Sequence, residues 1–103
     1  MEPRDEAESI LKELGARLCK DTSDRDVWDW AYWPTLDMVE SQDAQEDLKQ
    51  TTVREYVVND MIYRLGEQLP DMAKDVPTDA KEYSSARRKA RAAIKLAAQL
   101  EAL

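Results

Sequence analysis

Apolar residues recur every three or four positions in three long stretches of the chain, which is the spacing of one face of an α-helix. The first face, between residues 3 and 20, comprises Ala7, Ile10, Leu11, Leu14 and Leu18. Pro3 suits a first helical turn, and the acidic residues that follow it suit the positive end of the helix dipole. The pattern therefore predicts an amphipathic helix over residues 3–20 whose apolar face packs into a core.

A second apolar face lies between residues 52 and 69 and comprises Val53, Val57, Met61, Leu65 and Leu69, with Val58 and Ile62 beside it. Thr52 and Glu55 fit a capping box, in which each side chain accepts a hydrogen bond from the backbone N–H of the other. Pro70 lacks the N–H that the next turn needs, so the helix is predicted to end at Leu69. Residues 70–77 lie between two prolines and are predicted to form a connector.

The third face is rich in alanine and comprises Tyr83, Ala86, Ala90, Ala93, Ala97 and Leu100. It predicts a helix over residues 78–102, with Thr78 available as its N-terminal cap. Small side chains let another helix approach closely, so this alanine seam suits contact with a second helix, in the same chain or in another copy.

Between the first two faces, the chain is predicted to be helical only in short pieces. Residues 21–26 are typical of a loop, in which Ser23 or Asp24 can cap the following helix. Because Pro34 disfavours helical geometry at Trp33, a short helix over residues 26–33 is predicted to end or kink there. Residues 35–49 are predicted to be helical but broken, with apolar positions at Leu36, Met38, Val39, Ala44 and Leu48.

The composition favours an all-α fold. The chain has 103 residues, 43% of them hydrophobic, which is enough for one modest core. Two glycines and four prolines are few for the many turns of a β-sandwich or barrel. We therefore predict a single domain over residues 1–103, built as a small bundle of four to five helices.

Several classes of enzyme are excluded by the residue types that the chain lacks. Without histidine there is no Ser-His-Asp triad and no His-ligated metal site. Cys19 is the only cysteine and cannot build a thiolate zinc site, and Gly15 and Gly66 lie too far apart for a phosphate-binding loop. We predict a protein that is not an enzyme and that uses no metal or other cofactor.

A cytoplasmic location is also predicted from the sequence. A single cysteine fits a reducing compartment, and the acidic N-terminal stretch lacks the apolar centre of a signal peptide. No apolar run is long enough to cross a bilayer, so no membrane contact is expected.

All three tryptophans and one tyrosine fall within six residues, at Trp28, Trp30, Tyr32 and Trp33. In a helix Trp28 and Tyr32 share one face, whereas Trp30 and Trp33 share another, which is more than one core face needs. The alternative is that a chain without phenylalanine fills its core with tryptophan. Since these residue types dominate binding energy at interfaces, we predict two buried rings and at least one exposed ring that contacts a partner. The flanking carboxylates predicted to orient that partner are Asp24, Asp26 and Asp29.

Charge is strongly polarised along the chain. Residues 1–50 carry fourteen acidic and six basic side chains, whereas residues 83–103 carry one acidic and five basic side chains. The two ends either pack against each other or present two surfaces to two kinds of partner. Acidic side chains along rigid helices can imitate the phosphates of a nucleic acid and occupy a basic groove. Further candidates for such an acidic surface are Asp21, Asp37, Glu40, Asp43, Glu46 and Asp47.

The basic residues of the last helix form a stripe. Arg87, Arg91 and Lys95 lie four residues apart, with Arg88 beside them. Guanidinium groups match phosphate oxygens, so the stripe is a candidate anion-binding site. Four cations on a chain of net charge −7 are a weak nucleic-acid footprint, and a solvated helix face is the alternative.

Taken together, these features predict a non-enzymatic protein-interaction module that acts as a regulator, adaptor or inhibitor. One version is an acidic inhibitor that mimics nucleic acid, and the composition is similar to that of small acidic helical proteins encoded by phages and mobile elements. The expected partner is another protein, which in the nucleic-acid-mimicking version has a basic groove. The chain itself is expected to be a monomer or a homodimer. The alternatives are a nucleic-acid-binding protein that uses the basic helix, or a structural homo-oligomer.

Overall fold

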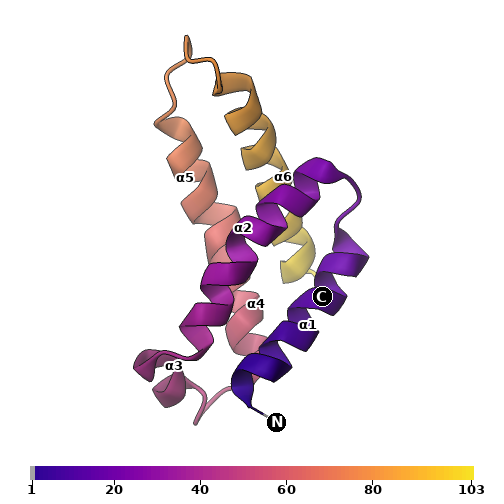
Figure 1. Ribbon diagram of the computed structural model, residues 1–103, viewed down its shortest axis with the longest axis vertical. Helices are drawn as coiled ribbons and strands as arrows, with labels where there is room; N and C mark the ends of the chain where they lie inside the picture. Colours follow the sequence, from indigo (N-terminus) through magenta and orange to yellow (C-terminus); the bar gives the residue numbers. More distant parts are fainter. Residues whose placement is uncertain (1) are drawn as a thin grey trace.

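The computed structural model describes residues 2–103, and within this range every regular element is a helix (Figure 1). The elements are α1 (Pro3–Leu18), α2 (Thr22–Val39), α3 (Gln42–Asp47), α4 (Val53–Tyr63), the π-helix η1 (Arg64–Gln68), α5 (Leu69–Lys74) and α6 (Tyr83–Glu101). The backbone stays helical from α4 through η1 into α5, so these three form one rod, the α4–α5 rod. Counted this way, residues 2–103 form five helices, and the predicted all-α bundle is confirmed.

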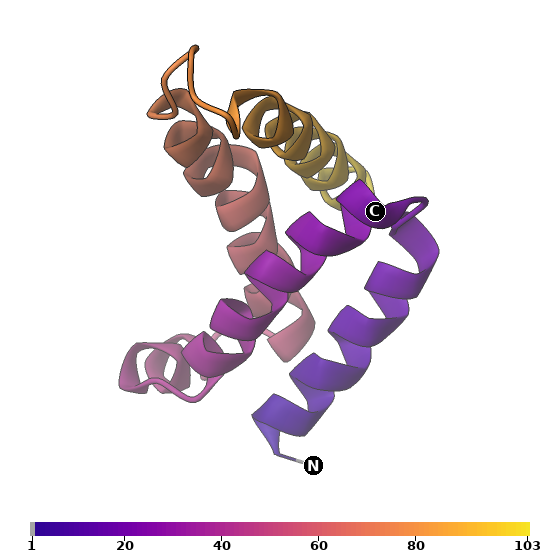
Figure 2. The same cartoon turned by 45° about the horizontal axis from the view of Figure 1, so that its top comes forward.

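The helices form two antiparallel pairs that meet along α2. One pair is α1 with α2, and the other is the α4–α5 rod with α6 (Figure 1 and Figure 2). α2 contacts α1, α4 and α6, while α6 contacts every part of the rod. The short α3 lies in the connection from α2 to α4, at the end of the molecule opposite the α5–α6 turn.

The core lies where the two pairs meet, and all three apolar faces found in the sequence contribute to it. Its largest fully buried side chains include Leu11, Leu14, Trp28, Leu36, Met61, Leu65 and Leu96. The C-terminal half of the alanine seam, at Ala93 and Ala97, is buried against the α4–α5 rod. A Cβ atom built on Gly66 would lie 3.2 Å from the Cβ of Ala97, so the small residues bring these two helices of the same chain together.

α2 begins at Thr22 and contains Pro34, so the predicted loop over residues 21–26 and the predicted end of a helix at Trp33 are both wrong. An internal proline removes one helical hydrogen bond and costs about 3 kcal/mol. The cost is offset by burial, because Thr35, Leu36 and Val39 beyond the proline face the same core as Trp28 before it. The cap of α2 also differs from the prediction: the carboxylate of Asp21, rather than Ser23 or Asp24, accepts from the backbone N–H of Asp24 at 2.9 Å.

Pro70 does not end the second long helix, which continues to Lys74. In the π-turn directly before it, the N–H of Leu69 donates to the carbonyl of Arg64, five residues back. This wider turn gives the proline ring room that regular α-helical spacing lacks. The connector is consequently displaced toward the C-terminus, and α6 begins at Tyr83 rather than at Thr78.

The remaining boundaries follow local capping chemistry. Thr52 caps α4 as predicted, with its hydroxyl accepting from the N–H of Glu55 at 3.0 Å. The Glu55 carboxylate accepts from the Thr51 hydroxyl at 2.9 Å, in place of the predicted capping-box bond to Thr52. The break predicted within residues 35–49 falls at Ser41, whose side chain accepts from the N–H of Ala44 at the start of α3.

Candidate protein-interaction surface

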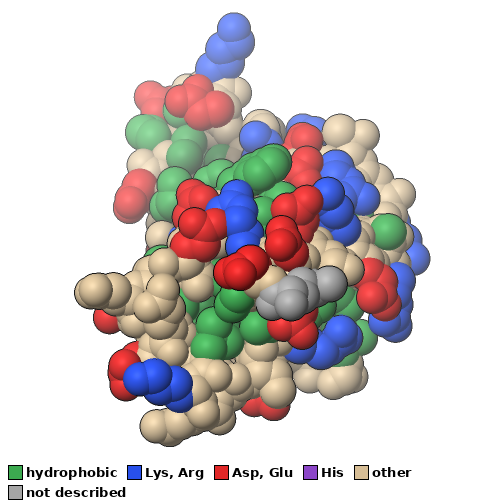
Figure 3. Space-filling view, turned by 60° about the horizontal axis from the view of Figure 1, so that its bottom comes forward, with side chains coloured by type: hydrophobic (Ala, Val, Ile, Leu, Met, Phe, Trp, Pro, Cys, Tyr) green, Lys and Arg blue, Asp and Glu red, His purple; other side chains and the backbone are tan. Residues whose placement is uncertain are grey.

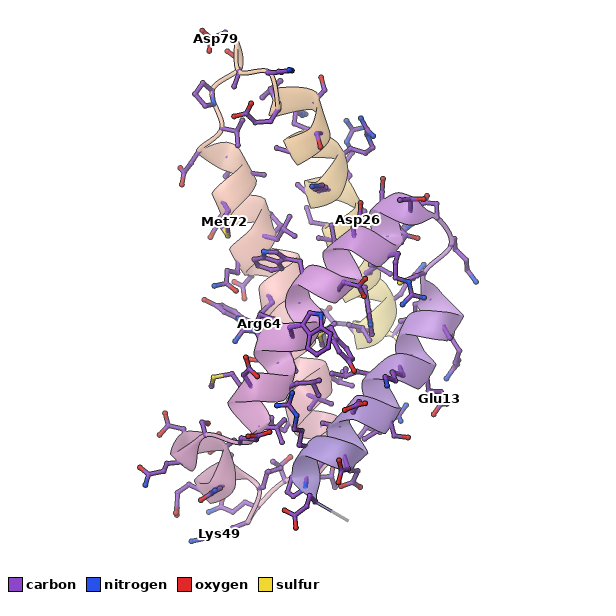
Figure 4. All side chains as sticks on the ribbon, viewed as in Figure 1. Glu13, Asp26, Lys49, Arg64, Met72 and Asp79 are labelled. Atoms are coloured by element: carbon purple, nitrogen blue, oxygen red, sulfur yellow. The ribbon has the colours of Figure 1, made fainter. Side chains whose placement is uncertain are left out.

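The outward face of α2 carries exposed carboxylates on both sides of an exposed tryptophan. We define this α2 ridge as Asp26, Asp29, Trp33, Asp37 and Glu40, all of them exposed. Their spacing of three or four residues places them on one side of the helix, which spans about 21 Å from first to last. The ridge is continuous only because α2 passes through Pro34. Figure 4 shows Asp26 near the N-terminal end of this helix.

Trp33 is the largest exposed side chain of the ridge, with 60% of its surface accessible. Its ring meets the ring of Tyr32 edge to face, with the two centroids 4.9 Å apart. Tyr32 is only 7% exposed, and burial raises the pKa of its phenol. Trp33 therefore rests against an ordered side chain, which limits the conformations that it must lose when a partner binds.

Two of the four aromatic rings in this segment, those of Trp28 and Tyr32, are buried, as predicted. Trp28 is 1% exposed and packs against α1 at Gly15, where an added Cβ would lie 2.6 Å from the indole nitrogen. Trp28 and Tyr32 therefore belong to the core and are left out of the candidate surface.

Trp30 is half-buried and lines an apolar groove between α2, α5 and α6. The groove has a volume of about 310 Å³, with Leu69, Met72 and Val76 among its lining residues. Asp26 and Lys89 are its charged lining residues, one of each sign. Trp30 thus lies between the α2 ridge and this apolar groove. Met72, which also lines the groove, is labelled in Figure 4.

Asp24 is buried, unlike the other two carboxylates grouped with the tryptophans in the sequence. Its side chain is 1% exposed, and the ammonium of Lys95 lies 2.8 Å from one carboxylate oxygen and 3.0 Å from the other. The backbone N–H of Lys20 donates to the same carboxylate at 2.9 Å. Burial alone would raise the pKa of Asp24, but these hydrogen bonds outweigh it and hold the pKa below its ordinary value.

Of the other predicted acidic residues, Asp21 caps α2 at its N-terminal end, whereas the remaining five lie around the end of the molecule that carries α3: Asp37, Glu40, Asp43, Glu46 and Asp47. Two of them share a cation: Arg4 donates to Glu40 at 2.7 Å and to Asp37 at 3.4 Å. Glu46 pairs with Lys49 at 3.2 Å, while Asp43 and Asp47 are exposed. On the face shown in Figure 3, acidic and basic side chains are interspersed, so cations of the same chain partly neutralise this acidic surface.

The predicted basic stripe of α6 is divided between an ion pair with α2 and the open surface. Lys95 is bound to Asp24, whereas Arg87 and Arg91 line a groove between α5 and α6. Arg88 is exposed, and across residues 2–103 none of these three arginines forms an ion pair.

Side chains that could carry covalent or metal chemistry are poorly placed for it. Burial raises the pKa of the Cys19 thiol, which keeps the nucleophilic thiolate scarce near neutral pH. Within the part of the chain that the structure describes, no three acidic or cysteine side chains gather in a way that could hold a metal ion.

One polar cluster between α2 and α4 was not anticipated from the sequence. The fully buried hydroxyl of Thr35 donates to Asp60 at 2.8 Å, and the guanidinium of Arg64 donates to the same carboxylate at 2.7 Å. Only the four-residue spacing of Asp60 and Arg64 signals this contact in the sequence. The cluster joins two helices of the core, so we assign it a structural role.

Comparison with protein-family models, with curated proteins and with solved structures finds no match to this chain. Among the described residues, no helix combines the length and the apolar character that crossing a membrane requires.

Proposed function

We propose that this protein is a non-enzymatic interaction module, a regulator, adaptor or inhibitor, whose α2 ridge docks on another protein. The observation that carries the proposal is Trp33, which is 60% exposed at the centre of a helix face lined with carboxylates. Tryptophan is strongly enriched among the side chains that dominate binding energy at interfaces. The carboxylates around it favour a partner whose apolar pocket is bordered by lysine or arginine.

The binding free energy of the α2 ridge should come from burial of the Trp33 side chain and from the carboxylates beside it. Full burial of one large apolar side chain contributes about 1.5–3 kcal/mol to binding. The edge-to-face contact with Tyr32 restricts the indole on one side, so less conformational entropy is lost on binding. Asp26 and Asp29 form no ion pair among the described residues, which leaves both carboxylates available to a basic partner.

A narrower version of the proposal is that the carboxylates imitate nucleic-acid phosphates and fill a basic groove. Fewer free carboxylates are available for this role than the sequence suggested, because Asp24 is buried and Arg4 binds both Asp37 and Glu40. Mimicry requires that binding weakens steeply with salt and that nucleic acid competes for the same site. Salt-insensitive binding that leaves nucleic acid in place contradicts this version while leaving the docking proposal intact.

The experiment that tests the proposal is affinity capture with the tagged, full chain from an extract of the organism that encodes it. Trp33→Ala is compared with Tyr63→Ala, which removes a ring of similar exposure, 52%, from α4 outside the ridge. We expect the first variant to lose the captured protein and the second to retain it. With the purified partner, Trp33→Ala should weaken binding by about thirtyfold, as expected for a hot spot. An unchanged affinity in this variant would reject the α2 ridge as the docking surface.

A further inference from the structure

A second groove lies along the α5–α6 hairpin and has the opposite charge to the α2 ridge. Its volume is about 430 Å³, and its lining comes from α5, α6 and the segment that connects them, without a residue of α1 or α2. We call it the α5–α6 groove and define it by its apolar residues Ala73, Val76, Ala90 and Ile94 and its cations Lys74, Arg87 and Arg91. The loop end of this hairpin, where Figure 4 labels Asp79, projects beyond the other helices (Figure 1).

The apolar part of the groove is incompletely covered. Ile94 is 50% exposed in the middle of α6, although Ala93 beside it is fully buried. Val76 and Ala90 are half-buried, so the groove offers a continuous apolar strip between two antiparallel helices. A strip of this kind accommodates side chains at helical spacing from an amphipathic partner.

The charge of the groove is of one sign. None of the residues that line it, all within the described range, is acidic. Arg87 is ordered, because it donates to the Tyr83 hydroxyl at 2.7 Å and its guanidinium carbon lies 5.6 Å from the centre of that ring.

We infer that the α5–α6 groove binds an acidic amphipathic helix of a partner protein. Apolar side chains of that helix fill the strip along Ala90 and Ile94, while its carboxylates meet Arg87 and Arg91. A nucleic acid fits less well, because its sugar–phosphate backbone offers nothing apolar to cover Ile94. With the α2 ridge on other elements, the molecule has two docking surfaces of opposite charge, which is the layout of an adaptor.

The test uses the full chain and a fluorescein-labelled synthetic peptide of about 18 residues, or five helical turns, with leucine on one face and glutamate elsewhere. Fluorescence anisotropy compares it with a peptide in which lysine replaces glutamate and with single-stranded oligothymidine. Arg91→Glu should weaken binding of the acidic peptide about tenfold. The matched control Arg88→Glu makes the same charge change on an exposed residue outside the groove, so it should have a clearly smaller effect.

Two further readouts keep the outcome decisive if a charge-reversed variant fails to fold. Amide chemical shifts of the unmodified protein should change most at Ala73, Val76, Ala90 and Ile94 when the acidic peptide is added. Ile94→Ser should weaken peptide binding without lowering the melting temperature by more than a few degrees, because this side chain is half exposed. Trp33→Ala should leave peptide binding unchanged, which separates this inference from the proposed role of the α2 ridge.

Several results would overturn the inference. They are failure of the acidic peptide to bind at about 100 μM, equal binding of the lysine peptide, and equal effects of the Arg88 and Arg91 substitutions. Tighter binding of the oligonucleotide that does not respond to Ile94→Ser would assign the cations to nucleic acid instead.

Discussion

The carboxylate of Asp24 and the ammonium of Lys95, 71 positions apart in the sequence, lie 2.8 Å apart in the folded chain. Asp24 is in the first turn of α2, where its carboxylate also accepts from the N–H of Lys20, and Lys95 is in α6. The pair therefore ties the α1–α2 turn to the last helix. It joins the acidic first half of the chain to the basic C-terminal helix within one molecule, one of the two arrangements that the charge pattern allowed.

Removing the Lys95 charge should destabilise the fold, because it leaves a buried carboxylate without its cation. Breaking a fully buried pair costs about 3–5 kcal/mol, but the Lys95 side chain is 45% exposed and solvent screens part of the effect. We expect Lys95→Met to lower the free energy of unfolding by about 1–2 kcal/mol in urea denaturation. Arg88→Met is the matched control, and equal losses in the two variants would show that the pair contributes nothing specific.

The same pair predicts how stability depends on pH. The pKa of Asp24 is lowered in the folded protein, so this group stabilises the fold above its unfolded pKa, and the contribution is lost as the pH falls through its folded pKa. We expect the free energy of unfolding to fall between about pH 5 and pH 2 by less in Asp24→Asn than in the unmodified protein. Parallel curves for the two proteins would mean that other carboxylates account for the whole acid dependence.

Trp28 and Trp33 should respond in opposite ways to truncation. Trp28 is 1% exposed in the core, so Trp28→Ala should cost about 3–5 kcal/mol of stability. Trp33→Ala removes an exposed ring and should change stability by no more than about 0.5 kcal/mol. Thermal denaturation followed by circular dichroism measures both. A large loss of stability in Trp33→Ala would place this ring in the fold and remove the main support for the α2 ridge.

Gly15→Ala should destabilise the protein although Gly15 lies within a helix. Alanine gains about 1 kcal/mol over glycine in a helix interior. The added methyl would lie 2.6 Å from the Trp28 indole nitrogen, and overpacking of this kind costs about 1–3 kcal/mol. Because the bulky indole is buried and can yield little, we expect a net loss in urea denaturation.

Gly66→Ala provides the comparison for the Gly15 substitution. Its added methyl would meet the Ala97 Cβ at 3.2 Å, a milder contact, so we expect stability close to that of the unmodified protein. A higher melting temperature for Gly15→Ala would mean that α1 does not approach Trp28 as closely as the structure places it.

Pro34→Ala should stabilise the protein, because Pro34 lies inside a continuous helix. An internal proline is about 3 kcal/mol less favourable than alanine in a helix. Alanine also raises the conformational entropy of the unfolded chain, which lowers the stability by about 0.4–1 kcal/mol. We expect a net gain of about 1–2 kcal/mol, measured by urea denaturation at neutral pH. A loss of stability would instead fit a chain that turns at Pro34, in which case Asp37 and Glu40 would not share a helix face with Trp33.

Much of this fold could be predicted from the sequence because the relevant signals are local. The spacing of Leu11, Leu14, Met61 and Leu65 on helix faces depends only on the geometry of the α-helix, and these residues are buried as the pattern indicates. Thr52 caps α4 through a bond to a residue three positions away, which the sequence also displays. The separation of the tryptophans into two faces follows from the same helical geometry.

Other features were decided by contacts between distant segments. Pro34 and Pro70 both mark helix ends by local rules, yet both helices continue, one because the residues beyond the proline face the core and the other because a π-turn accommodates the ring. Asp24 resembles its exposed neighbours in sequence, and only its approach to Lys95 removes it from the surface. Helix periodicity thus determined which residues could face a core or a partner, whereas the packing of α2 between α1, α4 and α6 decided which of them do, because burial depends on neighbours that are remote along the chain.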